Sequence, residues 1–280
     1  MVKLVRYGNS GAEKPGAIDS QGRLRDLSAH VDDIGPATLA DRAWLGALVV
    51  EDCPLVEGPV RLGPPLARPG KFIGIGLNYS DHAEEAGMPI PEAPIVFMKA
   101  TSSIAGPQDP LRLPQRARKT DWEVELGVVI GREAREVTPE TALSHVAGYL
   151  VVNDISERAW QLERGGQWTK GKSHAGFGPI GPWLVTTDEI PDPQSLGLWL
   201  KLNGEVMQQG NTGRMIFTVA ELIADLSRYM TLEPGDIITT GTPPGVGMGR
   251  DPQRFLRPGD VMELGIDGLG SQSITVEEAG

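Results

Sequence analysis

The sequence is poor in cysteine and in long hydrophobic runs. Cys53 is its single cysteine, so a disulfide within the chain is excluded, and this composition is typical of the reducing cytosol. No apolar run approaches the roughly 18 residues of a membrane-spanning helix, and the N-terminus has no long apolar core of an export signal. We therefore expect a cytoplasmic protein with no membrane partner.

Positive charge is also scarce. Lysine and arginine number 26 against 37 aspartates and glutamates, which gives a formal net charge of -11. A surface with this balance repels nucleic acids and anionic membranes. We expect a small-molecule ligand and no nucleic-acid partner.

Aromatic residues make up only 5% of the chain, whereas it contains 36 glycines and 23 prolines. This composition predicts many turns between short strands, and hence a β-rich α+β fold with short helices, among them one over residues 38–49. A segment dense in glycine and proline, residues 58–70, separates two parts of the chain. We place a small N-terminal domain at residues 1–66 and a larger domain at residues 67–280.

Residues 120–131 are the stretch around which the chain is organised. Apolar residues alternate there with Glu123, Glu125, Gly127 and Val129, the period-two pattern of a strand. Both glutamates therefore point to the same face, and Asp154 ends a later strand candidate. Two Glu and one Asp are oxygen ligands of the kind that Mg²⁺ or Mn²⁺ takes. The alternative is a solvated outer face of the strand.

His82 and Glu85 lie three residues apart in a short predicted helix, so they share one face. A carboxylate bonded to one imidazole nitrogen leaves the other nitrogen basic, as a water-activating general base requires. The alternative is an exposed helix on which the two side chains happen to be neighbours.

Residues 166–173 match the phosphate-binding loop pattern G-x-x-x-x-G-K-[ST]. The context is wrong, because a polar helix precedes the motif and residues 174–182 are too rich in glycine and proline to form a helix after it. We therefore reject nucleotide binding there. Lys172 remains a candidate buried cation, with a solvated loop lysine as the alternative.

Two further segments carry polar candidates. Arg158 and Gln161 share one face of a short helix that begins just after Asp154. Residues 239–249 form a glycine-rich loop after a strand, and its backbone amides suit the binding of an anion. Its spacing is not that of a dinucleotide-binding loop.

Taken together, separated motifs resemble the fumarylacetoacetate hydrolase family over roughly residues 70–270. They lie at residues 74–82 with Glu85, 121–131, 148–158, 170–173 and 240–247. Within that family, the sequence Trp-Glu-Val-Glu-Leu at 122–126 and the loop sequence at 242–249 are most similar to the 2,4-diketo-3-deoxy-L-fuconate hydrolase type. The resemblance implies a mixed β-sandwich roll with a small N-terminal domain, commonly a homodimer.

The resemblance also implies roles for residues of this chain. Glu123, Glu125 and Asp154 would hold Mg²⁺ or Mn²⁺, with Ca²⁺ as a further candidate. His82 with Glu85 would activate water, and Lys172 would stabilise developing negative charge. The substrate pocket would be lined by Arg158, Gln161 and Thr242. One departure is Ala175-Gly176, where relatives usually carry Asp-Thr.

The implied reaction is hydrolysis of a C–C bond in a 2,4-dioxo acid, an acylpyruvate or a 2,4-diketo-3-deoxy sugar acid, with release of pyruvate from this 2-oxo acid substrate. Decarboxylation of oxaloacetate, or hydration or isomerisation of a 2-oxo enoic acid, would use the same groups. A hypothesis of a different class is that the protein binds a metal ion but is catalytically inert. The retained base and extra cation argue against it, and the departure after Lys172 keeps it open.

Overall fold

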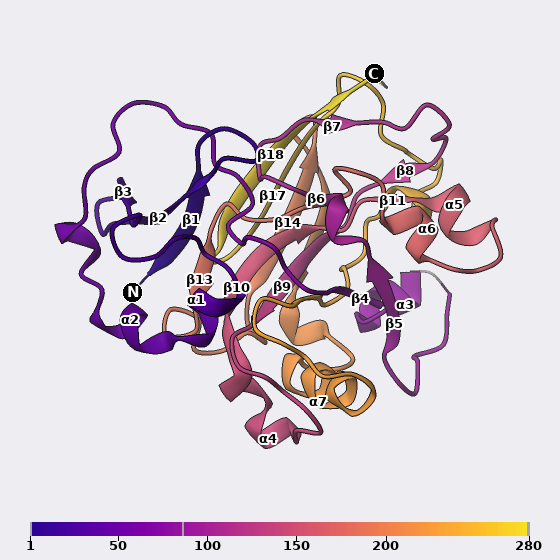
Figure 1. The fold of residues 1–280 in the computed structure, drawn as a ribbon. Helices are drawn as coiled ribbons and strands as arrows, with labels where there is room; N and C mark the ends of the chain where they lie inside the picture. The colour runs from indigo at the N-terminus through magenta and orange to yellow at the C-terminus, as the bar shows by residue number, and fades with distance from the viewer. Residues whose placement is uncertain (1, 86, 279–280) are drawn as a thin grey trace.

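The computed structural model describes residues 2–85 and 87–278, and its core is two facing β-sheets (Figure 1). The larger sheet has nine strands in the order β3-β2-β1-β13-β10-β9-β16-β4-β5, and the smaller has five in the order β15-β14-β17-β18-β7. The larger sheet comprises β1 (Lys3–Tyr7), β2 (Lys14–Ile18), β3 (Leu24–Asp26), β4 (Phe72–Gly76), β5 (Ile95–Lys99), β9 (Val124–Ile130), β10 (Val146–Asn153), β13 (Leu184–Thr186) and β16 (Ile237–Thr239). The fold is thus strand-rich α+β, as expected.

The smaller sheet and the helices complete the fold. The five strands of the smaller sheet are β7 (Leu111–Arg112), β14 (Gly197–Leu202), β15 (Glu205–Asn211), β17 (Val261–Ile266) and β18 (Gly270–Glu277). Two short pairs join β8 (Thr120–Asp121) to β11 (Ser156–Glu157) and β6 (Ile104–Ala105) to β12 (Gly178–Pro179). The α-helices are α1 (Pro36–Ala40), α2 (Arg42–Ala47), α3 (Ser80–Glu85), α4 (Pro139–Ala142), α5 (Arg158–Leu162), α6 (Thr169–Lys172) and α7 (Val219–Tyr229).

Strand β9 has the alternation predicted from the sequence. Val124, Leu126 and Val128 belong to the main core that also holds Leu200 and Leu264 of the facing sheet. Val129, on the opposite face, packs in a second core with residues of the N-terminal segment. Both faces of β9 are buried, because each is covered by another part of the chain. The end of the strand that carries the glutamates is therefore enclosed as well.

The N-terminal segment continues the large sheet. Strand β1 pairs antiparallel with β13, with Lys3 opposite Val185 and Leu4 opposite Leu184. In Figure 1 the indigo strands β1 to β3 extend that sheet on the left of the molecule. Leu4 packs with Leu150 in the second core. The domain boundary at residue 66 stays a prediction, but strands on its two sides share one sheet.

Local turn and cap signals place several elements correctly. Asn203 and Gly204 both have positive φ and join β14 to β15, as their sequence predicts. The predicted helix over residues 38–49 is instead two helices. It breaks because the Asp41 side chain accepts a hydrogen bond from the Ala43 amide and so starts α2 as a new helix.

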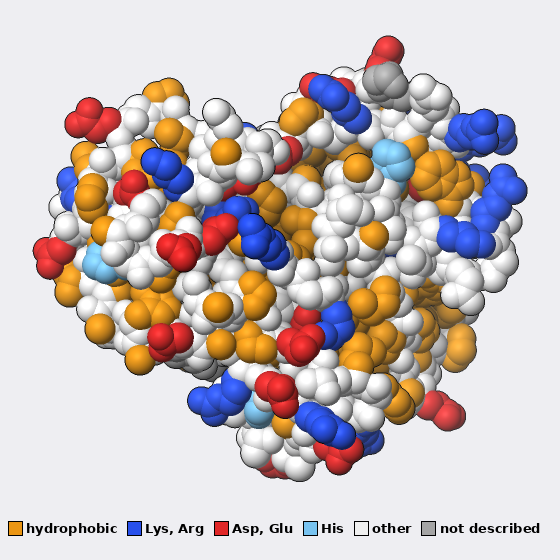
Figure 2. All heavy atoms as spheres, in the orientation of Figure 1, with side chains coloured by type: hydrophobic (Ala, Val, Ile, Leu, Met, Phe, Trp, Pro, Cys, Tyr) orange, Lys and Arg blue, Asp and Glu red, His pale blue; other side chains and the backbone are white. Residues whose placement is uncertain are grey.

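No helix in the described part of the chain is long and apolar enough to cross a membrane. Figure 2 shows acidic and basic side chains interspersed over the visible face, with a group of basic side chains at its right-hand edge. On this face the surplus of negative charge is therefore spread out, and no single field of one sign dominates.

Candidate functional site

The carboxylates of Glu123, Glu125 and Asp154 meet at the ends of two neighbouring strands. Strands β9 and β10 are antiparallel, with Val152 opposite Glu125, and the Asp154 amide donates to the Glu123 carbonyl at 2.9 Å. Residues opposite one another on antiparallel strands share a face, so Asp154 joins both glutamates. One oxygen from each side chain lies within 4.8 Å of the other two.

All three carboxylates are buried. Glu123 is 6% exposed, Glu125 1% and Asp154 0%, so the alternative of a solvated outer face is wrong. Buried carboxylates this close repel one another unless a cation or a proton intervenes. Three hard oxygen donors with room for further ligands fit a divalent ion such as Mg²⁺ or Mn²⁺. The triad can therefore hold a metal ion.

Lys172 and Lys99 supply buried positive charge to this triad. The Lys172 Nζ donates at 2.6 Å to both Glu123 Oε2 and Asp154 Oδ2, which excludes a solvated loop position. The Lys99 Nζ donates to Asp154 Oδ1 at 2.6 Å and to the carbonyl of Phe177 at 3.0 Å. Sequence reasoning missed Lys99, which is fully buried.

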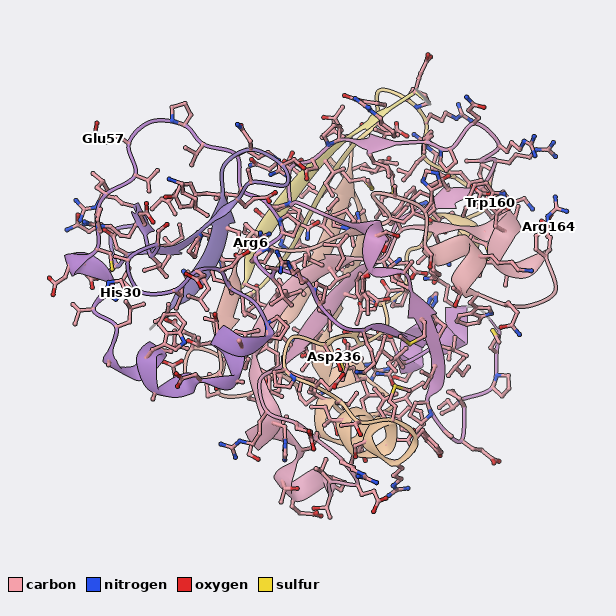
Figure 3. All side chains as sticks on the ribbon, viewed as in Figure 1. Arg6, His30, Glu57, Trp160, Arg164 and Asp236 are labelled. Carbon is pink, nitrogen blue, oxygen red and sulfur yellow. The ribbon has the colours of Figure 1, made fainter. Side chains whose placement is uncertain are left out.

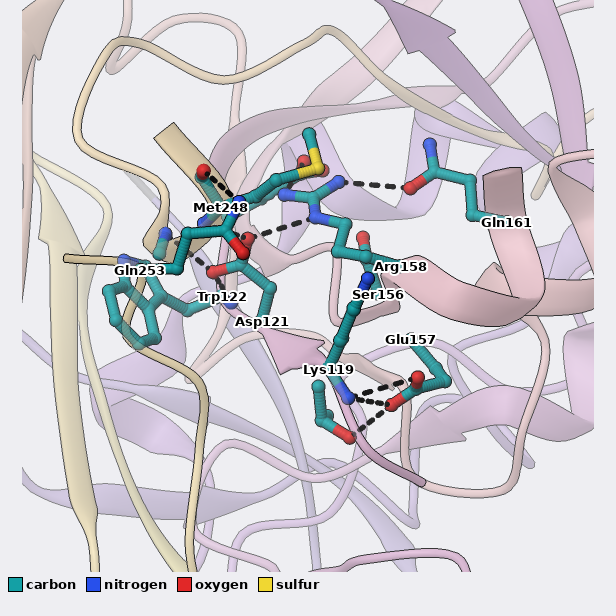
Figure 4. A network of polar contacts seen from close by, with 12 residues as sticks. Lys119, Asp121, Trp122, Ser156, Glu157, Arg158, Gln161, Met248 and Gln253 are labelled. Carbon is teal, nitrogen blue, oxygen red and sulfur yellow. Dashed lines mark hydrogen bonds and ion pairs between the residues drawn. The ribbon is translucent and has the colours of Figure 1, made fainter. Parts of the chain in front are cut away.

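Arg158 links the triad to a fourth buried carboxylate. Its Nε donates to Asp121 Oδ2 at 2.9 Å, and its NH2 lies 2.7 Å from Glu123 Oε1. Its NH1 donates to Gln161 Oε1 at 3.1 Å (Figure 4), so the predicted i, i+3 pair is formed. Figure 4 also shows the carboxylate of Glu157 in β11, which accepts a hydrogen bond from the backbone amide of Lys119. The arginine is thus fixed before any ligand binds.

The two glutamates have opposite pKa shifts. Burial alone would raise the pKa of Glu123, but the charges of Arg158 and Lys172 outweigh burial and lower it to about 2. Burial raises the pKa of Glu125 well above 4.5, and the negative charges of Asp154 and Glu123 raise it further. Of the two glutamates, Glu125 is therefore the one whose protonated form is favoured by burial and by its neighbours.

We expect Mg²⁺ or Mn²⁺ binding to release a proton from Glu125. A carboxylic acid must lose its proton to become a metal ligand, and the raised pKa means that this proton is still bound above pH 4.5. Metal affinity should therefore increase as the pH rises and decrease as it falls. Titration calorimetry in buffers of different ionisation enthalpy measures the released proton. A proton count of zero for the wild type would contradict the assignment.

His82 and Glu85 form the predicted pair on α3. The His82 Nδ1 lies 3.0 Å from Glu85 Oε2, and the two side chains are only 15% and 26% exposed. The Gly245 amide donates to Glu85 Oε1 at 3.0 Å and so fixes the carboxylate from the other side. The pair lines the same cavity as the acidic triad, which separates it from an ordinary exposed helix pair.

The backbone amides of the glycine-rich loop bind carboxyl groups of side chains of the protein itself. The Gly241 amide donates to Glu125 Oε2 at 2.8 Å. The Gly247 amide donates to Asp121 Oδ1 at 2.7 Å, and the Met248 amide to Asp121 Oδ2 at 3.0 Å. The loop thus positions the carboxylates of the site.

Thr242 lies in this loop and lines the cavity. Its hydroxyl donates to the Val124 carbonyl at 2.9 Å and accepts from Gln208 Nε2 at 2.8 Å. Both interactions hold the loop against β9. Thr242 therefore shapes the wall of the cavity while its hydroxyl is engaged within the protein.

The departure at Ala175-Gly176 leaves Lys172 in place. The His174 ring is tilted against two aromatic rings, with its centroid 5.2 Å from that of Phe177 and 6.2 Å from that of Trp160. Gly176 has a φ of +82°, a conformation that glycine adopts readily. The Lys172 ammonium is oriented by Glu123, by Asp154 and by the Phe97 ring, whose centroid lies 5.0 Å away. Its orientation thus depends on those partners and not on residues 175 and 176.

These groups surround one cavity of about 410 Å³. Its lining includes His82 and Glu85 from α3, and it includes Glu123, Glu125 and Lys172, which form what we call its acidic end. Arg158 and Gln161 contribute from α5. The structure therefore brings together at one cavity all the candidate residues except Asp154, which lies behind Glu123 and Lys172.

Comparison with known proteins assigns the class. Residues 71–277 match the model of the fumarylacetoacetate (FAA) hydrolase C-terminal family. A Burkholderia ambifaria protein that bears the provisional name of hydrolase is 61% identical over 274 residues, 97% of each chain. The chain belongs to the fumarylacetoacetate hydrolase family and is an enzyme of that family.

Solved structures agree with this assignment over the whole chain. The fumarylacetoacetate hydrolase from Exiguobacterium antarcticum has a TM-score of 0.87 at 34% identity, covering 99% of this chain and 100% of that one. Maleylpyruvate hydrolase from Sphingobium sp. SYK-6, solved in complex with manganese(II) and pyruvate, has a TM-score of 0.84 at 28% sequence identity, and the match covers 99% of this chain and 100% of that one. A 2-hydroxyhepta-2,4-diene-1,7-dioate isomerase from Mycobacterium marinum has a TM-score of 0.79 at 31% identity, and the match covers both chains fully.

Proposed function

We propose that the protein hydrolyses the C–C bond between the acyl carbon and the methylene of a 2,4-dioxo acid, with Mg²⁺ or Mn²⁺ bound, and releases pyruvate. The observation that carries the proposal is that one cavity is lined by two different groups of side chains. One is a histidine with a carboxylate partner, and the other belongs to a buried acidic triad with its own cations. The first suits the activation of water, and the second suits the binding of a 2-oxo acid through a metal.

In the proposed reaction His82 removes a proton from the attacking water. Glu85 orients the imidazole through Nδ1, so the Nε2 is the nitrogen that faces the water. The hydroxide adds to the C4 carbonyl, the C3–C4 bond breaks, and its electron pair goes to C3. When bound, a divalent ion at Glu123, Glu125 and Asp154 supplies positive charge that stabilises the negative charge developing on the pyruvate half. Lys172 adds to the same effect.

Charge balance supports a substrate with one carboxylate at this end of the cavity. The buried cluster combines four carboxylates with three cations, namely Asp121, Glu123, Glu125 and Asp154 with Lys99, Arg158 and Lys172. With all groups ionised it carries one net negative charge, which a bound divalent ion reverses. A single substrate carboxylate then neutralises the cluster, which is favourable in a buried site.

Isomerisation is the second candidate, favoured by the similarity to the Mycobacterium marinum isomerase. That reaction moves a proton between carbons and needs no attacking water. Decarboxylation of oxaloacetate would also use the acidic end of the cavity. Decarboxylation gives no role to His82 and its carboxylate partner, and isomerisation would use them for proton transfer between carbons without water, so hydrolysis accounts for more of the site.

The test is pyruvate release from acetylpyruvate, oxaloacetate and 2,4-diketo-3-deoxy-L-fuconate, with Mg²⁺, with Mn²⁺ and with a chelator. We expect metal-dependent release from the 2,4-dioxo acids and a loss of at least about 100-fold in Glu123→Ala, because a missing ligand weakens both metal binding and substrate positioning. Release from oxaloacetate alone would establish decarboxylation. Tight metal binding without turnover of any compound would favour the inert metal-binding protein.

A further inference from the structure

The half of the cavity next to His82 and Glu85 is apolar. Leu77 precedes α3, and the Met88 amide that follows it donates to the Ala83 carbonyl at 3.0 Å, so both cavity-lining side chains flank the histidine. On the loop side, Val246 follows Gly245, whose amide donates to Glu85. Other apolar side chains of the lining lie nearer the acidic end, since the Phe97 ring is 5.0 Å from the Lys172 Nζ and 5.6 Å from the Trp168 ring.

Positive charge in the lining is confined to the acidic end. Among the described residues, Arg158 and Lys172 are the lysines and arginines that line the cavity, and both are engaged with Glu123. Basic residues beside the lining segments are directed elsewhere. Arg250 lies 3.6 Å from Glu205 and Arg214 lies 3.8 Å from Asp81. Figure 3 places Arg164 at the outer edge of the molecule, and it is not among the residues that line the cavity.

Polar groups suited to a hydroxylated chain are also few in this half. Of the uncharged polar side chains in the lining, the Thr242 hydroxyl is engaged with Val124 and Gln208, and the Gln161 Oε1 accepts from Arg158. A substrate hydroxyl or carboxylate placed beside Leu77, Met88 and Val246 would lose its water without gaining a partner there. That loss is unfavourable for a hydroxyl and far more unfavourable for a charged group.

We propose that this half is the acyl subsite, and that it selects 2,4-dioxo acids whose acyl group is an uncharged hydrocarbon chain or ring. The proposal rests on the proposed hydrolysis, because it places the C4 carbonyl at His82 and the acyl group beyond it. In the balanced reaction water supplies a hydroxyl to the acyl carbon and a proton to C3. The products are pyruvate and a hydrocarbon carboxylic acid, which ionises in water.

A matched pair of substrates tests the selection. In 4-methylpentanoylpyruvate the acyl chain ends in two methyl groups, and in succinylpyruvate it ends in two carboxylate oxygens of nearly the same shape. We expect kcat/KM for the first to exceed that for the second by at least about 100-fold, because the carboxylate would be buried without a cation. For 2,4-diketo-3-deoxy-L-fuconate, with its hydroxylated chain, we expect a smaller deficit of about 10-fold.

Met88→Lys is the diagnostic variant, since it places an ammonium at the mouth of this half. Met88 is 50% exposed, so the change should be tolerated by the fold. We expect the preference for 4-methylpentanoylpyruvate over succinylpyruvate to fall by about 10-fold or more. Met98→Lys is the matched control, because Met98 is 36% exposed on β5 and absent from the lining. Its preference should equal that of the wild type.

The outcomes separate the two proposals. Pyruvate release at equal or higher kcat/KM from succinylpyruvate, or from the hydroxylated substrate, overturns the apolar acyl subsite and leaves the hydrolysis standing. No pyruvate from any 2,4-dioxo acid overturns the hydrolysis itself. The wild-type comparison decides the acyl preference even if Met88→Lys does not fold.

Discussion

Lys99→Met is expected to lower the free energy of unfolding by about 3–5 kcal/mol, the usual cost of removing one partner from a buried ion pair. The Lys99 Nζ donates to Asp154 Oδ1 at 2.6 Å, to the Lys172 carbonyl at 2.5 Å and to the Phe177 carbonyl at 3.0 Å. Methionine has a similar length and no donor. It would leave those acceptors without their ammonium in a place that water does not reach. Urea denaturation followed by circular dichroism measures the loss.

Lys14→Met is the matched control, since Lys14 is an exposed lysine at the start of β2. Its unfolding free energy should stay within about 0.5 kcal/mol of the wild type. A Lys99→Met protein as stable as the control would show that this ammonium does not stabilise the buried carboxylate. Metal affinity, measured on the folded variant, should also fall, because Lys99 holds Asp154 in position.

Much of the candidate site could be predicted from local patterns. The alternation along residues 120–131 predicts that Glu123 and Glu125 lie on the same strand face as Val129. The structure has this alternation, since Val128 and Val129 pack in two separate cores. A spacing of three residues in a short helix is enough to pair His82 with Glu85. Such patterns succeed because strand and helix periods fix which side chains are neighbours within one element.

Lys99 was missed because a lysine at the end of an apolar strand is usually solvated. The one available signal was that Lys99 lies two residues after Phe97 in the same strand. Both therefore share the inward face of β5, whereas Val96 and Met98 point outward. The alternation alone does not reveal which of the two strand faces is enclosed. The enclosure comes from Lys172 and Phe177, more than 70 residues away, whose carbonyls accept from Lys99.

Asp121 and the glycine-rich loop show the same limit at longer range. The sequence indicates that the amides of residues 239–249 suit an anion, but it does not identify the anion. The Gly247 amide binds Asp121, separated from it by 126 residues. The sheet pairing of β1 with β13 likewise depends on contacts across most of the chain, so the sequence of the first 66 residues gave no sign of it.

His82→Ala is expected to lower kcat for the preferred 2,4-dioxo acid by about 10²- to 10⁴-fold, the usual contribution of a general base. Metal affinity should not change, because His82 is not among the three clustered carboxylates. Glu85→Gln should cost less, about 10- to 100-fold, since the amide oxygen can still accept from Gly245 while the charge beside the imidazole is lost. Steady-state kinetics, with metal affinity measured by calorimetry, checks both variants.

His145→Ala supplies the matched control, because His145 is partly exposed and its Nδ1 donates to the Glu133 carbonyl at 2.7 Å, outside the cavity. Its kcat should equal that of the wild type. If His82→Ala kept the wild-type kcat, water would have to be activated by another group, and the proposed division of the cavity would be wrong. A loss of kcat accompanied by an equal loss of metal affinity would show that His82 acts through the triad and would contradict its role as a separate base.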